Sequence, residues 1–188
     1  TVTVEESISN LIPQGRKRNS MMISFYPVRE NVMPPSRANP SDAGMDVFFC
    51  PDKNASNGGV KGTATDCVDG IVSVAPGKNA ILPTGLKFGI PHGYMLQVCN
   101  RSSMGAKKNL LAGAHVIDSG YAGEVFIDLH NVGDAVQTVT PGDKIAQLVM
   151  IPVIAVTPII ATHEESLYGM TPITISNRGD GALGSTGK

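Results

Sequence analysis

Short runs of β-forming residues, separated by glycine and proline, are the feature that most limits how this chain can fold. The sequence contains 21 glycines and 13 prolines but only 5% aromatic residues. Frequent turns between short runs favour an all-β plan over a helical one. Strands are predicted at residues 23–28, 43–49, 71–74, 80–90, 94–99, 125–132, 144–156 and 153–160. Pro83 predicts that the 80–90 strand lies at a sheet edge or is interrupted.

Size, charge and cysteine content narrow the class of protein. A chain of 188 residues suits one domain with its own core. The net charge of −1 provides no global basic field for duplex nucleic acid. No apolar run is long enough to span a membrane, and the N-terminus has no signal-like pattern, so we expect a soluble protein of the cytoplasm or nucleus. The three cysteines are scattered, which favours free thiols and gives no zinc pattern.

The sequence predicts a body with two tails and one insertion. Residues 1–20 are polar and are expected to form a disordered tail, and residues 21–176 are expected to form the folded body. Residues 51–70 are poor in apolar side chains and are interpreted as a surface loop or hairpin insertion, a candidate contact for a partner. Residues 177–188 form a glycine-rich arm. It is either a flexible terminus or an arm whose backbone amides close over a phosphate.

The stretch from Ala114 to Glu124 carries the most promising chemistry. Its pattern predicts a strand, a tight turn at Ser119–Gly120 and a second strand. A carboxylate at Asp118 and a ring at Tyr121 on one rigid hairpin suit water activation and stacking. The alternative is an ordinary hairpin with a turn-capping aspartate and a half-buried tyrosine.

Three further polar positions leave alternatives open. The run Arg101-Ser102-Ser103 follows a strand and predicts a short helix with a serine cap, a place that suits phosphate. Taken by itself, the segment is better explained as a plain N-cap with a surface arginine. Asp46 among apolar residues is either paired with a cation or catalytic. Gln147 is either a core amide or a ligand-binding one.

Five segments in this order resemble the trimeric deoxyuridine triphosphatase (dUTPase) family. They are Ala43–Asp46, Arg101–Ser103 with Lys107, Val116–Glu124, Gly142–Leu148 and Arg178–Gly187. The resemblance spans about residues 23–187. Residues 1–20 and 51–70 lie outside the family pattern.

The resemblance implies a fold, a reaction and a cofactor. The fold is a distorted jelly-roll or β-barrel subunit of a homotrimer, with active sites at subunit interfaces. The reaction is Mg²⁺-dependent hydrolysis of dUTP to dUMP and pyrophosphate, which keeps uracil out of DNA and supplies dUMP for thymidylate synthesis. Magnesium would be held by the triphosphate and water rather than by protein side chains.

Roles follow by resemblance onto the matching positions. Asp118 would activate the water that attacks the α-phosphorus, and Gln147 would hold that water or the α-phosphate. Asp46 would act from nearby, as a structural acid or through a residue that contacts the substrate. The substrate-binding set would be Arg101, Ser102, Ser103, Ala112, Val116, Ile117, Tyr121, Phe126, Arg178, Leu183, Gly184 and Ser185. The chain departs from the family at Leu183, which stands where a phenylalanine is usual, at Ala182, where glycine is usual, and at His115.

Other functions are compatible with parts of the pattern. A dCTP deaminase would share the subunit fold and an Arg-Ser-Ser loop, but should lack the Gly-Ser-Thr-Gly arm. A nucleotide-sensing trimer would use the 51–70 insertion to engage a partner. A structural coat protein would give no reason for five polar motifs.

Overall fold

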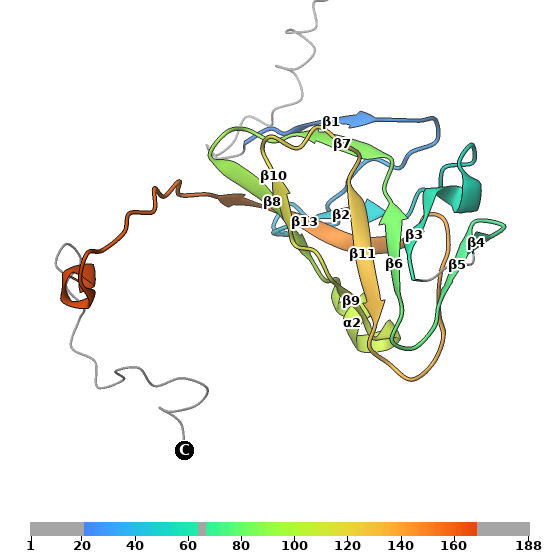
Figure 1. Cartoon of the computed structure of the whole chain (residues 1–188). Helices are drawn as coiled ribbons and strands as arrows, with labels where there is room; N and C mark the ends of the chain where they lie inside the picture. The colour runs from blue at the N-terminus through green and yellow to red at the C-terminus, as the bar shows by residue number, and fades with distance from the viewer. Residues whose placement is uncertain (1–20, 64–66, 169–188) are drawn as a thin grey trace, which may run out of the picture. The chain divides into compact units, whose positions relative to one another are not determined.

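The computed structural model of the chain describes residues 21–63 and 67–168 (Figure 1). The expected N-terminal tail and the expected C-terminal arm lie outside these residues. The chain divides into two compact units after Val153, and all the paired strands of the described chain lie in the first. None of the helices in the described ranges is long and apolar enough to cross a membrane.

Short strands account for most of the regular structure, as the sequence predicts. The helical elements are η1 (Ser56–Gly59), α2 (Ser102–Lys108) and η2 (Glu164–Tyr168). The strands are β1 (Ser24–Pro27), β2 (Met45–Phe48), β3 (Lys61–Gly62), β4 (Cys67–Val68), β5 (Ile71–Val74), β6 (Asn79–Pro83), β7 (Leu86–Gly89), β8 (Tyr94–Cys99), β9 (Leu110–Ala112), β10 (Val116–Asp118), β11 (Phe126–Asn131), β12 (Gln137–Val139) and β13 (Lys144–Pro152). The all-β prediction is therefore confirmed.

Two four-stranded antiparallel sheets make up the body. Their strand orders are β10-β8-β13-β2 and β3-β6-β11-β9. In two smaller sheets β1 pairs with β7, and β5 pairs with β12 on one side and β4 on the other (Figure 1). Alternate residues of each strand point inward, so Leu96 and Leu148 from one sheet join Leu82 and Ile127 from the other in one apolar core. The outward positions of the same strands remain available for polar side chains.

Most predicted strands are present, but one is interrupted and another is missing. The strands at 71–74 and 94–99 have the predicted bounds. The 80–90 run is interrupted, as Pro83 predicts, and gives β6 and β7. The edge alternative for that run is wrong for β6, which pairs with both β3 and β11. The strand expected at 153–160 is also wrong: the described chain forms no strand after Pro152, although the amide of Val153 still donates to the Gly93 carbonyl at 2.8 Å.

The hairpin expected at 114–124 does not form. Strand β10 pairs with β8, whereas the following strand, β11, pairs with β6 and β9. The two limbs therefore enter different sheets, and the residues between them form a connecting loop. The turn itself is present, because the Tyr121 amide donates to the Asp118 carbonyl at 3.1 Å.

An ion pair links this connecting loop to Arg29, two residues after β1. Nη1 and Nη2 of Arg29 donate to the two carboxylate oxygens of Glu124 at 3.1 and 2.9 Å. The same carboxylate accepts the backbone N–H of Gly85 at 2.7 Å. The Arg29 and Glu124 side chains are only 14% and 18% exposed, so each depends on the other for compensation of its charge.

We expect Glu124→Ala to lower the free energy of unfolding by about 2–3 kcal/mol, because it leaves a largely buried guanidinium and a backbone N–H without their acceptor. Urea unfolding at fixed protein concentration measures this loss. Glu30→Ala is the matched control, since Glu30 is exposed, and we expect a change within about 0.5 kcal/mol. Equal stability of the two variants would contradict a structural role for the Arg29–Glu124 pair.

Candidate functional site

Asp46 lies at the centre of a charged cluster on the outward face of the β10-β8-β13-β2 sheet. Its Oδ1 accepts a hydrogen bond from Nε of Arg101 at 2.9 Å, and its Oδ2 lies 2.8 Å from Nζ of Lys144. The Asp46 side chain is 16% exposed. Two cations around one carboxylate leave the cluster with a net positive charge. This arrangement favours the ion-pair interpretation of Asp46 and suits an anionic ligand.

A β-bulge in β13 brings Lys144 and Gln147 to the same face as Asp46. In a regular strand, positions 144 and 147 would point to opposite faces. The register shifts between Lys144 and Ala146, so that Ile145 and Ala146 are both buried and the polar residues on either side both point outward. Gln147 then lies directly opposite Asp46 on β2.

The amide of Gln147 is held in one orientation. Its Nε2 donates to the carbonyl of Asn100 at 3.1 Å, and Asn100 Oδ1 in turn accepts the N–H of Ala112 at 2.7 Å. Gly44 lies beneath the amide, and a Cβ at this position would stand 2.9 Å from Oε1 of Gln147. A larger residue at this position would therefore displace the Gln147 amide from its hydrogen bond to Asn100.

Arg101 both closes the cluster and begins helix α2. It is the N-cap of the helix, and no side chain supplies a capping hydrogen bond. The expected serine cap is therefore wrong: Ser102 and Ser103 form the first helical turn, where backbone N–H groups have no intrahelical acceptor. Nη1 of Arg101 donates weakly to Ser103 Oγ at 3.4 Å and to the Lys144 carbonyl at 3.3 Å, and its Nη2 has no partner within the described residues.

A separate pocket of about 220 Å³ lies at the turn after β10. Asp118 supplies its carboxylate and Tyr121 its phenol ring. The lining residues are Val116, Ile117, Asp118, Tyr121, Val125 and Phe126. The Tyr121 hydroxyl donates to the Glu124 carbonyl at 2.7 Å, which fixes the ring against the connecting loop. β10 is the edge strand of its sheet, so in the described chain no strand occupies its outer edge.

The charged cluster and the pocket lie apart within one chain. Asp118 pairs with Met95 at one end of β8, and Gln147 pairs with Cys99 at the other end, on the opposite side of β8. Four residues along the strand and two strand spacings across it place Asp118 and Gln147 roughly 16 Å apart. Within one chain, the Asp118 carboxylate and the Gln147 amide are therefore too far apart to contact the same atom.

The other sequence candidates divide into three groups. Val116, Ile117 and Phe126 line the pocket, as expected for ligand contacts. Ala112 lies in β9 beside Asn100 and outside the pocket. Arg178, Leu183, Gly184 and Ser185 lie outside the described residues.

Sequence reasoning missed Lys144 and Asn100. The signal for Lys144 was present, since polar residues three apart with two apolar residues between them break strand alternation and indicate a bulge.

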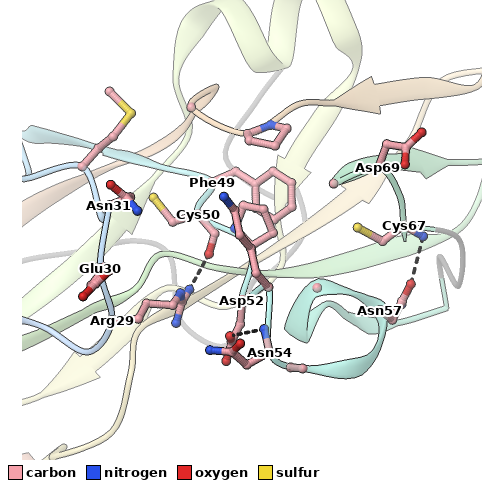
Figure 2. A pocket seen from close by; sticks show the side chains of 18 residues that line it. Arg29, Glu30, Asn31, Phe49, Cys50, Asp52, Asn54, Asn57, Cys67 and Asp69 are labelled. Atoms are coloured by element: carbon pink, nitrogen blue, oxygen red, sulfur yellow. Dashed lines mark hydrogen bonds between the residues drawn. The ribbon is translucent and has the colours of Figure 1, made fainter.

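A second, larger cleft lies elsewhere in the described chain. It measures about 1160 Å³ and is bordered mainly by the 29–33 segment and the 51–70 insertion. Figure 2 shows Arg29, Glu30 and Asn31 on one side and Asn57, Cys67 and Asp69 on the other. Burial raises the pKa of the Cys67 thiol, so this cleft presents a neutral thiol rather than a nucleophile.

Comparison with known proteins gives a single family. The family model described as dUTPase matches residues 67–187. A deoxyuridine 5'-triphosphate nucleotidohydrolase of Syntrophotalea carbinolica is 34% identical over 170 residues, covering 89% of this chain and 98% of that protein. An enzyme of the same name from Roseobacter denitrificans is 39% identical over 124 residues, covering 65% of this chain and 76% of that one.

Solved structures show the same fold. The dUTPase of Staphylococcus bacteriophage 80alpha, solved as a mutant with dUpNHpp, gives a TM-score of 0.69 at 21% identity and covers 90% of this chain and 100% of that one. A mutant dUTPase from phage phi11 of S. aureus, described with a structural Mg(II) ion, gives 0.60 at 23% identity and covers 77% of this chain and 99% of that one. The distorted jelly-roll fold class is thereby confirmed.

We expect Gly44→Ala to destabilise the protein by about 1–2 kcal/mol, because the added methyl group displaces the Gln147 amide and presses on Val149. Thermal unfolding followed by circular dichroism measures the loss. Gly120→Ala is the matched control, since a Cβ there would meet nothing within 4 Å. If Gly44→Ala were as stable as the control, the close packing of Gly44 against Gln147 would be refuted.

Proposed function

Because the chain belongs to the dUTPase family, we propose that it is a dUTP diphosphatase, which hydrolyses dUTP to dUMP and pyrophosphate. The observation that carries the proposal is the pocket that presents Asp118 and Tyr121 beside an unpaired strand edge. The basic cluster around Arg101 and Lys144 supplies the groups that a triphosphate requires.

Asp118 is the base in the proposed reaction. Its carboxylate accepts a proton from a water molecule as the water oxygen bonds to the α-phosphorus. The bond from the α-phosphorus to the bridging oxygen breaks, and pyrophosphate leaves with the electron pair. An ionised carboxylate is an acceptor only, which suits this role.

The basic cluster binds the phosphates in this proposal. Arg101 presents Nη2, and Ser102 and Ser103 present the backbone N–H groups of the first helical turn. Gln147 holds the α-phosphate or the attacking water with an amide already oriented by Asn100. Asp46 acts through Arg101: both its oxygens are engaged by cations, so it positions the guanidinium and does not reach the reacting atoms.

Uracil is recognised by the free edge of β10. Backbone groups between Ala114 and Asp118 that point away from β8 pair with the acceptor-donor-acceptor edge of the base. Cytosine would leave such groups unpaired, so the site would favour uracil strongly over cytosine. Tyr121 packs under the sugar and leaves no room for a 2′-hydroxyl, while Val116, Ile117 and Phe126 form the walls. Ala112 lies behind Asn100 and supports the site indirectly.

A homotrimer completes the active site. The separation of Asp118 from Gln147 within one chain supports a site shared between copies. The outward face of the sheet between them is mostly apolar and half-buried, with Met95, Val149 and Ile151 around the single amide of Gln97. A second copy that covers this face brings one chain's pocket to another chain's cluster.

The C-terminal arm contributes the last contacts in this proposal. Arg178 and Ser185 bind phosphate oxygens, and Leu183 and Gly184 cover the base.

Magnesium is proposed as the cofactor on the triphosphate. Within the described residues no group of three His, Cys, Asp or Glu side chains could hold a metal ion. Mg²⁺ commonly takes phosphate oxygens and water as ligands, so the residues present are compatible with it. When bound, it supplies neutralisation of the triphosphate charge. The structural Mg(II) of the phage phi11 relative lends support to metal binding in this fold.

A second candidate is a nucleotide-sensing trimer that engages a partner. The cleft of about 1160 Å³ at the 51–70 insertion favours it, because the proposed hydrolysis uses none of the residues that line this cleft. Nucleotide binding without turnover distinguishes this candidate from the enzyme. The deaminase alternative is distinguished by release of ammonia from dCTP.

Pyrophosphate release with Mg²⁺ tests the proposal, measured separately with dUTP, dCTP, UTP and dTTP. We expect release from dUTP alone. The edge of β10 excludes the cytosine of dCTP, Tyr121 excludes the 2′-hydroxyl of UTP, and the narrow pocket excludes the methyl group of dTTP. Ammonia from dCTP would place the chain with the deaminases. No release from any nucleotide, with dUTP still bound, would overturn the enzymatic proposal in favour of sensing.

Asp118→Asn tests the base directly. We expect kcat to fall by at least about 100-fold, because the amide cannot accept the proton, while dUpNHpp binding stays within about threefold. Steady-state kinetics and calorimetric titration measure the two quantities. Asp134→Asn, an exposed change outside the site, is the control and should retain full turnover. Undiminished activity of Asp118→Asn would exclude this residue as the water activator.

A further inference from the structure

The insertion places one lysine beside the Asp118 pocket. Strand β3 pairs with β6 so that Lys61 lies opposite Ile81, and Ile81 lies opposite Asp128 on β11. Phe126 is two residues from Asp128 along β11 and therefore points to the same face of the sheet. The position of Lys61 is thus fixed by sheet register across β6.

The lysine contacts a wall of the pocket. Its Nζ lies 4.6 Å from the centroid of the Phe126 ring, and Phe126 lines the pocket together with Asp118 and Tyr121. Lys61 forms no salt bridge with any residue that the structure describes. The carboxylate in its own row, Asp128, already accepts hydrogen bonds from Asn79 at 2.8 Å and pairs with His130 at 3.0 Å.

The charges of the residues that line the pocket suggest what Lys61 does. Asp118 is the one carboxylate among the lining residues of the pocket. None of these residues carries a positive charge that would offset the repulsion between Asp118 and an anionic nucleotide. The cations Arg101 and Lys144 of the same chain belong to the other half of the site. A cation at the edge of the pocket offsets this repulsion and attracts phosphate.

We propose that Lys61, supplied by the 51–70 insertion, is an additional nucleotide-binding residue, whose ammonium group contacts the phosphate chain of the nucleotide held beside Asp118 and Phe126. This proposal rests on the proposed dUTP hydrolysis and assigns to the insertion a role in the active site. The Phe126 ring holds the ammonium in place by a cation–π contact. The lysine binds the substrate and takes no part in proton transfer.

Lys61→Met is the decisive variant, because it keeps the aliphatic stem over Phe126 and removes only the charge. We expect KM for dUTP to rise about fivefold, the scale of one partly exposed charge pair, with kcat within about twofold. Binding of dUpNHpp should weaken by the same factor, whereas binding of the uncharged deoxyuridine should not change. Lys61→Arg should remain close to wild type, since it keeps the charge.

Lys53→Met is the matched control, because Lys53 belongs to the same insertion but borders the other cleft. An unchanged KM in Lys61→Met would overturn the proposal. Equal weakening of dUpNHpp binding and deoxyuridine binding would also overturn it, because a lysine that only packs against Phe126 would affect both ligands alike. The KM comparison requires a wild-type protein that hydrolyses dUTP, whereas the binding comparison does not. A wild type that binds dUpNHpp but releases no pyrophosphate from dUTP contradicts the hydrolysis itself, and charge-selective weakening of dUpNHpp in Lys61→Met would still support the phosphate contact.

Discussion

The register of strand β8 is the constraint on which the rest of the site depends. Met95 at one end of the strand pairs with Asp118, and Cys99 at the other end pairs with Gln147. Backbone hydrogen bonds of two ladders fix these positions, so no side-chain rotation closes a gap of roughly 16 Å. In the proposed reaction, the water-activating carboxylate and the phosphate-binding cluster would act together only when a second copy lies across the sheet. Oligomerisation would then be part of the proposed chemistry.

Each half of the site is made rigid by a different local device. In the cluster, the β13 bulge turns Lys144 to the face that carries Asp46, and the ion pair holds Arg101 ready for an anion. In the pocket, the Arg29–Glu124 pair anchors the loop that carries Tyr121. Both devices use charge pairs that are partly shielded from water, where removal of one partner is costly. For the proposed hydrolysis, such preorganisation of both parts before substrate arrives would favour catalysis by positioning.

Local patterns in the sequence predicted much of the fold and the identity of the candidate groups, but not their pairing. The alternation from Tyr94 to Cys99 predicted β8 with its bounds, because one face is buried and the other is not. The prediction of a hairpin at 114–124 was wrong. A short turn specifies only that the chain reverses, whereas the sheet that each strand joins depends on partner strands far away in sequence. The Asp46–Arg101–Lys144 cluster joins three distant segments, and Lys61 reaches Phe126 only across β6. Such contacts depend on register, which the single sequence does not display.

Subunit mixing measures most directly whether the active site is shared between copies. Asp118→Asn and Gln147→Ala proteins, each inactive alone, are unfolded together in equal amounts, refolded and assayed for pyrophosphate release from dUTP. If Asp118 of one copy works with Gln147 of another, random assortment restores about a quarter of wild-type activity, since half of the chains carry each intact residue. If both residues act from the same chain, no site contains both and the mixture remains inactive. Recovered activity is the predicted result, and an inactive mixture of correctly assembled trimers would contradict it.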